Sequence, residues 1–353
     1  MQSYDVTEWG QPLQMRLRDT PQPGPDEVLV RLSHCGVCHS DVHVREGWFD
    51  LGGGQKLKLS DRGNPLPLTL GHEPIGIVQA VGASVRGVQV GRQVLVNPWI
   101  GCGHCRFCLE GRDNLCNLMR ALGVGAPGGF ATHLMVPNAR YLVDADGLDP
   151  ATGAVLACSG VTAYSAISKF GAMAPDDWVA VIGCGGVGLM ALSILAAMGH
   201  AKVIACDIDD TKLQAARELG AAATVNLAAT PGPEELLRLS GGGLTHMVDF
   251  VGMPSTAQLA LPSLLKGGQF VAVGLFGGAL QLPLPALAMR EVALRGSVVG
   301  NTEHLRELVQ LVRSSRLRLP AVQLRPLAEA EASLRDLAEG RIVGRVVLEC
   351  LAG

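Results

Sequence analysis

Two sets of residues in the sequence have the chemistry of metal ligands. The more compact set is a loop in which Cys102, Cys105, Cys108 and Cys116 place four thiols close together, with glycines between them and no hydrophobic period. Four thiolates at this spacing suit tetrahedral zinc in a closed structural site. A nucleic-acid-binding zinc finger is the alternative, but no basic helix follows and acidic residues lie inside the loop. The pattern therefore predicts a structural metal site.

The second set is scattered along the chain. Cys38, His72-Glu73 and Cys158 each have small or turn-forming neighbours. The stretch from Cys38 to His43, which we expect to begin a loop, holds a thiol, two imidazoles, a hydroxyl and a carboxylate. Each of these groups can ligate a metal, move a proton or position a group that does. A lone Cys or His is more often a packed core residue, so the spacing alone leaves the catalytic role open.

A third chemical motif is a G-x-G-x-x-G segment that follows an apolar run at 179–182 and opens a predicted helix, which is the context of a dinucleotide site. Its residues are Gly183, Cys184, Gly185, Gly186, Val187 and Gly188. The glycines permit a tight turn, approach of the pyrophosphate and close packing of helix on strand. Asp207 closes the next predicted strand, where a carboxylate accepts from the ribose 2′-OH and repels a 2′-phosphate, so NAD is favoured over NADP. Lys212 is also within reach of the ribose.

Composition narrows the class of protein. The chain has 353 residues, 48% hydrophobic and 17% charged, with a net charge of −3 and a pI near 6.3. The length predicts two domains, and the charge gives no case for binding nucleic acid or an anionic membrane surface. We expect no signal peptide, and ten cysteines in such a chain indicate a reducing, cytoplasmic setting. The apolar run at 179–199 contains four glycines, so we interpret it as a strand, a turn and a buried helix and not as a membrane span.

The pattern of elements changes near residue 150. Before it, short strands are expected at 27–32, 75–81, 93–96, 130–136 and 141–143, interrupted by irregular segments at 48–70 and 98–128. A helical stretch at 150–170 leads into alternating strands and helices, typical of a doubly wound α/β fold with a parallel sheet. The strands are expected at 178–182, 202–207, 223–226, 247–250, 269–273 and 292–298, and the helices at 187–198, 211–219, 234–239, 256–265 and 305–312. The tail, with a strand at 322–324, a helix at 330–337 and a strand at 344–349, is expected to return to the first domain.

Taken together, these motifs resemble those of the zinc-dependent medium-chain alcohol dehydrogenases, especially the tetrameric bacterial and archaeal branch. The matching segments stand in family order at 36–43, 71–73, 97–99, 102–116, 158–160, 183–188, 273–277, 296–301 and 344–345. The resemblance implies a GroES-like β-rich catalytic domain at 1–157, to which 297–353 return, and a Rossmann domain at 158–296. It also implies NAD, two zinc ions per subunit and a homotetramer.

The resemblance assigns roles in the catalytic set. Cys38, His72 and Cys158 would bind the catalytic zinc, and Glu73 would be an acidic neighbour able to approach the metal. Asp41 would hold the His72 imidazole. On the same stretch, Ser40 would hydrogen-bond the substrate hydroxyl and His43 would accept its proton through the nicotinamide ribose. Such a site oxidises an alcohol through a zinc alkoxide that gives its hydride to NAD.

Other implied roles concern the cofactor and the substrate. The pyrophosphate would be held by His39 and Arg345, and the nicotinamide would be lined by Val273 and Leu275. The substrate candidates are Trp48, Phe49, Trp99, Ala121 and Leu275, with ordinary core packing as the alternative for the three aromatics. The segment 52–58 lengthens the loop before Gly71 beyond the family pattern, which leaves the substrate size open.

These observations predict an NAD-dependent zinc alcohol dehydrogenase that interconverts primary or secondary alcohols and their aldehydes or ketones. One alternative is a related polyol, aldehyde-adduct or acyl-thioester-linked alcohol dehydrogenase with the same machinery and another pocket. A second is a metal- and nucleotide-binding scaffold without turnover, which the presence of Ser40, His43 and all three zinc-ligand positions argues against.

Overall fold

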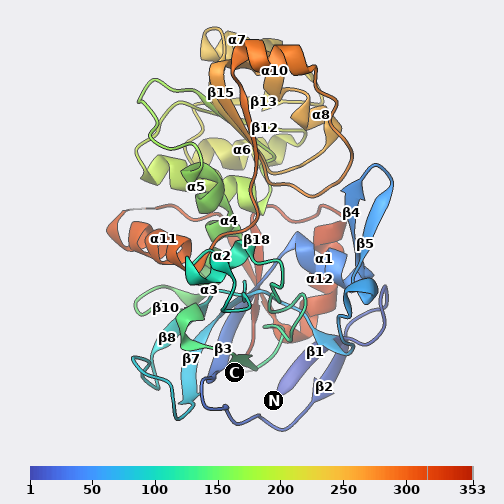
Figure 1. The fold of residues 1–353 in the computed structure, drawn as a ribbon, viewed down its shortest axis with the longest axis vertical. Coiled ribbons are helices and arrows are strands. Elements are labelled where there is room, and N and C mark those ends of the chain that lie inside the picture. Colours follow the sequence, from blue (N-terminus) through green and yellow to red (C-terminus); the bar gives the residue numbers. More distant parts are fainter. Residues whose placement is uncertain (316, 352–353) are drawn as a thin grey trace.

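The computed structural model describes residues 1–315 and 317–351. Figure 1 shows two parts stacked along the long axis, with the parallel sheet in the upper part and the N-terminal strands in the lower part. Helices α4 (Ser159–Ser168) and α11 (Thr302–Ser314) lie between the two parts and pack on each other.

The lower part is built on the long strand β3 (Val28–Val37), which β7 (Glu73–Val81), β9 (His133–Val136) and β18 (Arg345–Glu349) flank in antiparallel pairing. The sheet order is β10-β8-β7-β3-β18-β17, completed by β8 (Gln93–Val96), β10 (Leu142–Asp144) and β17 (Val322–Pro326). A smaller sheet joins β1 (Gln2–Val6) to β2 (Gln14–Leu17) and β6 (Leu68–Thr69). Because β18 pairs with β3, residues 345–349 lie beside an N-terminal strand.

The upper part contains a six-stranded, wholly parallel sheet in the order β13-β12-β11-β14-β15-β16. This is the doubly wound dinucleotide-binding order, and it confirms the predicted fold class. The strands are β11 (Val179–Ile182), β12 (Val203–Asp207), β13 (Ala223–Asn226), β14 (Leu244–Asp249), β15 (Leu264–Ala272) and β16 (Ala293–Gly296). The connecting helices are α5 (Gly186–Ala197), α6 (Asp210–Glu218), α7 (Glu234–Ser240), α8 (Pro254–Ala257), α9 (Ala260–Ser263) and α10 (Leu284–Arg290).

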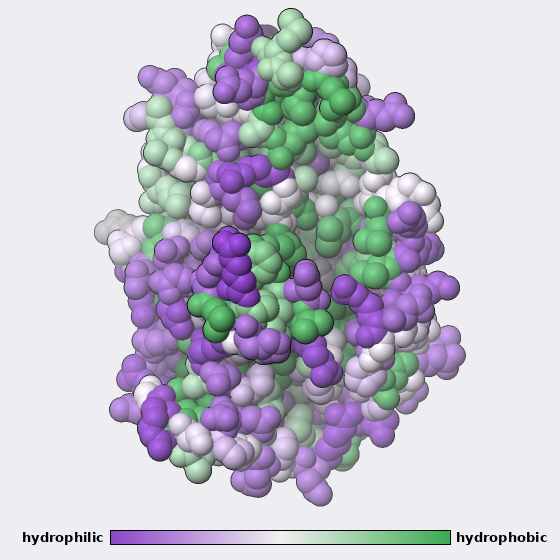
Figure 2. All heavy atoms as spheres, in the orientation of Figure 1, coloured by the Kyte–Doolittle hydropathy of each residue, from purple (hydrophilic) through white to green (hydrophobic). Residues whose placement is uncertain are grey.

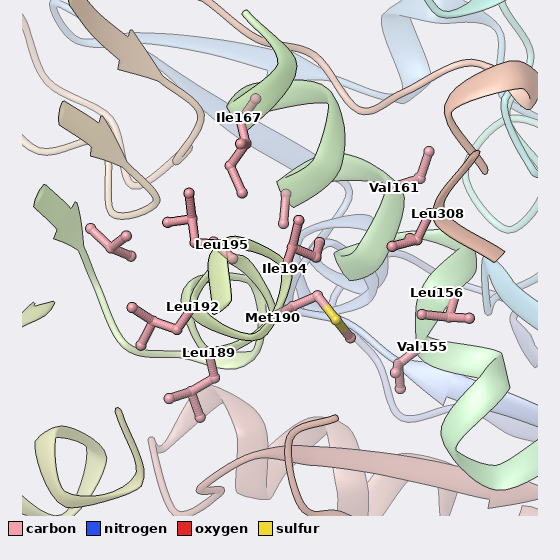
Figure 3. Close-up of a cluster of buried hydrophobic side chains, with 14 of the residues drawn as sticks. Val155, Leu156, Val161, Ile167, Leu189, Met190, Leu192, Ile194, Leu195 and Leu308 are labelled. Atoms are coloured by element: carbon pink, nitrogen blue, oxygen red, sulfur yellow. The ribbon is translucent and has the colours of Figure 1, made fainter. Parts of the chain in front are cut away.

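Helix α5 is apolar on all sides because it is covered on all sides. Figure 3 shows its side chains, among them Leu189, Met190 and Ile194, surrounded by residues of α4, α11 and the turn at Val155–Ala157. At its start, a Cβ on Gly188 would lie only 1.7 Å from the carbonyl oxygen of Gly183. The glycine is therefore what lets the helix approach strand β11. The interpretation of the apolar run at 179–199 as strand, turn and buried helix is confirmed.

Three local predictions were wrong. The stretch after Cys38 is the first turn of helix α1 (His39–Glu46) and not the start of a loop, because the Asp41 carboxylate accepts from the Cys38 N–H and caps the helix. The segment 48–70 is not wholly irregular, since β4 (Trp48–Gly52) and β5 (Gln55–Lys58) form a hairpin. The helix expected at 256–265 is split into α8 and α9, with strand already from Leu264, and Pro262 lacks the N–H that a continuous helix needs there.

The remaining elements agree with the predicted pattern or add to it. Helices α2 (Arg106–Leu109), α3 (Pro150–Ala154) and α12 (Ala330–Ala338) complete the set in the lower part. Helix α10, which the sequence pattern did not predict, has no buried residue. Figure 2 shows apolar side chains gathered near the top of this view, where α10 lies.

Among the described residues, no single helix is long and apolar enough to cross a membrane; one bent pair, Pro150–Ala157 with Ser159–Ser168, meets the length and composition test only when taken together.

Candidate active site and metal centres

The scattered catalytic set converges in the structure. Cys38 is the N-cap of α1, His72 and Glu73 lie at the start of β7, and Cys158 is the N-cap of α4. All four are buried, and one ligand atom from each lies within 4.8 Å of the others. The Sγ atoms of Cys38 and Cys158, 120 residues apart in sequence, are 4.0 Å apart. The β-sheet register brings these residues together, which their spacing in the sequence could not show.

Asp41 fixes the orientation of the imidazole in this cluster. Its buried carboxylate accepts from the N–H groups of Cys38 at 2.9 Å and Gly71 at 3.2 Å, and its Oδ1 lies 3.0 Å from Nδ1 of His72. With Nδ1 engaged in this way, Nε2 of His72 is a buried nitrogen without a hydrogen-bond partner among the described residues. A carboxylate that holds one ring nitrogen so that the other can ligate is a common arrangement behind metal-binding histidines.

The charges in the cluster favour a bound cation. Burial by itself would lower the pKa of His72, but the charges of Asp41 and Cys38 raise it well above its usual range. The pKa of the Cys38 thiol lies well below its usual range, because it receives a hydrogen bond from Cys158 and lies beside His72. The pKa of Cys158 is raised in turn by its hydrogen bond to Cys38 and by burial. The hydrogen bond between the two sulfurs thus shifts their pKa values in opposite directions.

The donor set fits zinc. Two thiolates at about 2.3 Å from a tetrahedral zinc ion lie roughly 3.8 Å apart, close to the observed separation of the two sulfurs. Two sulfurs and one imidazole nitrogen leave a fourth position open, as in catalytic zinc sites. The unpartnered Nε2 of His72 is the third donor that such an ion requires.

Glu73 belongs to the cluster by position but is held by another residue. Nη2 of Arg345 donates to both carboxylate oxygens of Glu73, and both side chains are buried. Burial raises the pKa of Glu73 to about 7, against the opposing charge of Arg345. A Cβ on Gly186 would lie 2.4 Å from Cδ of Arg345, so this arginine also lies against the glycine-rich segment. Its Nε has no partner among the described residues. Arg345 therefore connects the metal cluster with the start of helix α5.

An apolar cluster packs around the two thiols. Trp99 and Ala121 pack with Cys38 and Cys158 in one buried cluster, and partly buried Val299 packs against it. Val299 has a φ of +38°, which a β-branched residue rarely adopts, so the backbone is strained beside the thiols. Sequence reasoning named the segment 296–301 without singling out Val299, and its special backbone conformation has no signal in the sequence.

The other substrate candidates lie farther out. Phe49 contacts the imidazole of His43, with ring centroids 5.2 Å apart, while Trp48 is covered by the ammonium group of Lys56. Neither belongs to the buried cluster around the thiols. Leu275 is 57% exposed and lines a cavity beside the segment 296–298. The structure therefore brings Trp99 and Ala121 to the metal cluster and does not bring Trp48 there.

The residues of helix α1 face in different directions. The rings of His39 and His43 are 5.2 Å apart, and His39 also contacts Phe276 of the upper part, with centroids 5.3 Å apart. Burial lowers the pKa of His43, with a further contribution from His39. The imidazole of His43 is thus neutral near pH 7 and able to accept a proton. Ser40 is half-buried on the same helix.

The four-cysteine loop forms a second group of thiols. Cys102, Cys105, Cys108 and Cys116 offer sulfurs within 4.8 Å of one another. Sγ of Cys108 lies 3.9 Å from that of Cys102 and 3.5 Å from that of Cys105. The Cys105 and Cys102 N–H groups donate to the sulfurs of Cys102 and Cys116, each at 3.4 Å. Amide donors of this kind stabilise thiolates, and four sulfurs at these distances fit tetrahedral zinc in a closed site.

The glycine-rich segment lies at the carboxyl ends of β11 and β12. Gly183 has a φ of +88°, as the tight turn requires. Asp207 accepts from the Cys184 N–H at 2.7 Å and from two N–H groups that follow it in the chain. A Cβ on Gly185 would meet no atom within 4 Å, so the approach to the helix N-terminus is open. The turn, the open approach and the carboxylate are arranged as a dinucleotide site requires.

Comparison with known proteins gives a consistent result. Residues 24–146 match the alcohol dehydrogenase GroES-like domain and residues 186–314 match the zinc-binding dehydrogenase domain. The chain belongs to the zinc-dependent medium-chain alcohol dehydrogenases. It is 35% identical over 350 residues to the NAD-dependent alcohol dehydrogenase of Sulfurisphaera tokodaii, covering 99% of each chain. The crystal structure of the alcohol dehydrogenase from Aeropyrum pernix aligns with a TM-score of 0.87 and 32% identity, over 99% of this chain and 100% of that one.

Membership in this family confirms the predicted resemblance and fold class. The alcohol dehydrogenase is an oxidoreductase with a GroES-like domain and a Rossmann-like parallel sheet, and its family is NAD-dependent and zinc-binding. An alcohol dehydrogenase of Geobacillus stearothermophilus, 33% identical over 351 residues and covering 99% of each chain, places the same family in bacteria.

Proposed function

We propose that this protein is an NAD-dependent zinc alcohol dehydrogenase that reversibly oxidises primary and secondary alcohols to aldehydes and ketones, using Ser40 and His43 to move the proton. One observation carries the proposal: two buried thiols and a buried imidazole with a free Nε2 form a three-donor set, while Arg345 holds the carboxylate of the fourth member of the cluster, Glu73. Through Arg345, which contacts Glu73 and Gly186, this set adjoins the dinucleotide segment.

A zinc ion held by Cys38, His72 and Cys158 would supply the Lewis acid that lowers the pKa of an alcohol hydroxyl, and NAD would supply the hydride acceptor. The chain itself orients the imidazole through Asp41 and excludes water with the apolar cluster around the thiols. Ser40 takes a hydrogen bond from the substrate hydroxyl. The neutral imidazole of His43 accepts the proton and releases it to solvent.

The turn at Gly183 and the contacts of Asp207 support our assignment of the cofactor residues. We place the pyrophosphate at the helix N-terminus formed by Gly183, Gly185, Gly186, Val187 and Gly188. We also assign the imidazole of His39 and the guanidinium of Arg345 to the pyrophosphate, and the buried, unpartnered Nε of Arg345 supports the second assignment. Asp207, with Lys212 nearby, receives the adenosine ribose and disfavours a 2′-phosphate. Val273 and Leu275 flank the nicotinamide. In the substrate pocket we place Trp99 and Ala121, with Phe49 beside His43.

Three further points complete the proposal. Two zinc ions bind per subunit, one catalytic and one in the four-cysteine loop. The catalytic domain comprises residues 1–157 and 297–353, and the Rossmann domain comprises residues 158–296. All ten cysteines are free thiols, which suits the reducing cytoplasm. The exposed Leu284 and Met289 of α10 form an apolar surface of the kind that interfaces cover, which supports a homotetramer that light scattering can test.

Metal removal tests the proposal. Dialysis against a chelator should abolish NADH formation from alcohols, while NAD still binds, as measured by calorimetry. Restoring zinc should restore turnover. Full activity of protein shown by metal analysis to lack zinc would contradict the proposal.

A further inference from the structure

A cavity of about 600 Å³ lies between the four-cysteine loop, helix α4 and the carboxyl ends of β15 and β16. Its wall includes apolar side chains of Leu115, Leu275 and Val298 and a basic group from each of three elements. The proposed function places two residues of this wall, Val273 and Leu275, beside the nicotinamide and leaves the basic groups unused.

The basic groups are Arg112, Lys169 and His304, and the described part of the cavity wall contains no carboxylate. Among the described residues, Nζ of Lys169 contacts two hydroxyls and a carbonyl and no carboxylate, and burial together with the charge of Arg295 lowers its pKa. Nε of Arg112 and Nδ1 of His304 are buried without hydrogen-bond partners among the described residues. Arg112 pairs with the Glu110 carboxylate, so the ammonium group of Lys169 is the cation of the wall without a carboxylate partner among the described residues, and together with the unused polar atoms it favours an anion.

Lys169 also prepares two hydroxyl groups to donate. Its Nζ donates to Oγ of Ser165 at 3.0 Å and to Oγ of Ser297 at 2.9 Å, as well as to the Ser165 carbonyl. Each hydroxyl accepts from the ammonium group and keeps its own proton for another acceptor. Both serines line the cavity. An anion there would thus receive hydrogen bonds from hydroxyls that a nearby positive charge polarises.

The cavity adjoins the metal cluster. Val298 lines it, and Val299, the next residue, packs against the buried cluster of Cys38 and Cys158. The Asn114 side chain, another part of the wall, holds this segment by donating to the Val298 carbonyl at 3.0 Å. Cys158 and Lys169 are the N-cap and C-cap of helix α4, so Ser165 and Lys169 lie about 10 and 16 Å along its axis from Cys158, at 1.5 Å per residue.

We infer that this cavity binds the carboxylate of the substrate, so that the enzyme prefers medium-chain alcohols with an anionic far end, such as ω-hydroxy acids, and the corresponding oxo acids. The inference rests on the proposed function, because it concerns the substrate of the same metal cluster. The apolar wall accepts the methylene chain, and Ser165, Ser297, Lys169 and Arg112 receive the carboxylate.

The test compares 10-hydroxydecanoate with its methyl ester, which has the same carbon chain and no charge. The wild-type enzyme should show a kcat/KM for the acid at least about 10-fold above that for the ester. Lys169→Gln and Arg112→Gln should each lower the acid-to-ester ratio by about 10- to 100-fold, the effect of losing one charge-assisted interaction. Turnover of the ester shows in the same assay that each variant is folded.

Lys202→Gln is the matched control, because Lys202 lies outside the cavity wall and pairs with exposed Asp176. It should leave the acid-to-ester ratio unchanged. The inference is overturned if the wild-type acid-to-ester ratio of kcat/KM is near one, or if neither cavity variant changes that ratio. In both cases, oxidation of the ester still supports the proposed function. No NADH from either compound would instead count against the proposed function.

A free carboxylate separates a substrate subsite from an independent anion site. Octanoate should inhibit oxidation of 10-hydroxydecanoate competitively, and more weakly in Lys169→Gln. Octanoate that changes ester turnover without competing with the acid would assign the cavity to a separate effector and overturn the inference.

Discussion

Replacing Asp41 with Asn tests whether the buried carboxylate controls the metal site. Asp41 accepts from three donors, the N–H groups of Cys38 and Gly71 and the ring of His72. An Asn side chain keeps one oxygen but turns an NH₂ group toward at least one of these donors. That leaves a buried donor unpaired and removes the charge from the other contacts.

The expected loss follows from these contacts. A hydrogen bond to a charged group contributes about 1.5–3 kcal/mol, and losses within one network are not additive, so Asp41→Asn should lower the free energy of unfolding by about 2–4 kcal/mol. Loss of the carboxylate behind a metal-binding histidine should also weaken zinc binding about 10- to 100-fold. The first quantity is measured by denaturant unfolding of metal-free protein, and the second by competition with a chromophoric chelator.

Asp61→Asn is the matched control, since Asp61 is exposed and, among the described residues, its carboxylate accepts a side-chain hydrogen bond only from Ser60. It should change neither quantity. If Asp41→Asn binds zinc as tightly as the wild type and turns over alcohol at the same rate, the proposed orientation of His72 by Asp41 is refuted.

Three other predictions use the same structure. Cys38→Ala should leave the fold largely intact and abolish alcohol oxidation, whereas Cys105→Ala should lower the melting temperature because a closed zinc site contributes folding energy; equal melting temperatures for the two variants would argue against separate roles. Gly188→Ala should destabilise the protein, because the added Cβ would meet the carbonyl oxygen of Gly183. Gly185→Ala should keep the wild-type melting temperature, because its Cβ would meet no atom, but should lower the affinity for NAD measured by calorimetry. An unchanged affinity for NAD would show that the pyrophosphate does not bind at Gly185. Because the pKa of His43 is lowered, kcat/KM for alcohol should fall only as the pH drops below about 6.5, where the imidazole becomes protonated. His43→Ala should remove this decrease at low pH. If the variant shows the same decrease, another group causes it.

The sequence predicted well where chemistry and geometry are local. The glycine-rich segment, its preceding strand and the carboxylate of Asp207 were located because a strand, a tight turn and a helix follow one another within a short stretch. The four cysteines were grouped for the same reason, since a short loop can fold around one ion without help from distant elements. Alternation of strands and helices likewise predicted the parallel sheet, although Pro262 and the early start of β15 were overlooked.

What only the tertiary structure decided depends on contacts between distant residues. Residue types singled out Cys38, His72 and Cys158, but the pairing of β3 with β7 and the start of α4 place them around one point. Arg345 reaches Glu73 across 272 residues because β18 pairs with β3, and nothing near either residue encodes that contact. The basic cavity beside Val298 likewise exists only where three elements meet. Local patterns are set by neighbours in the chain, whereas the register of paired strands and the packing of helices decide which distant side chains share a site.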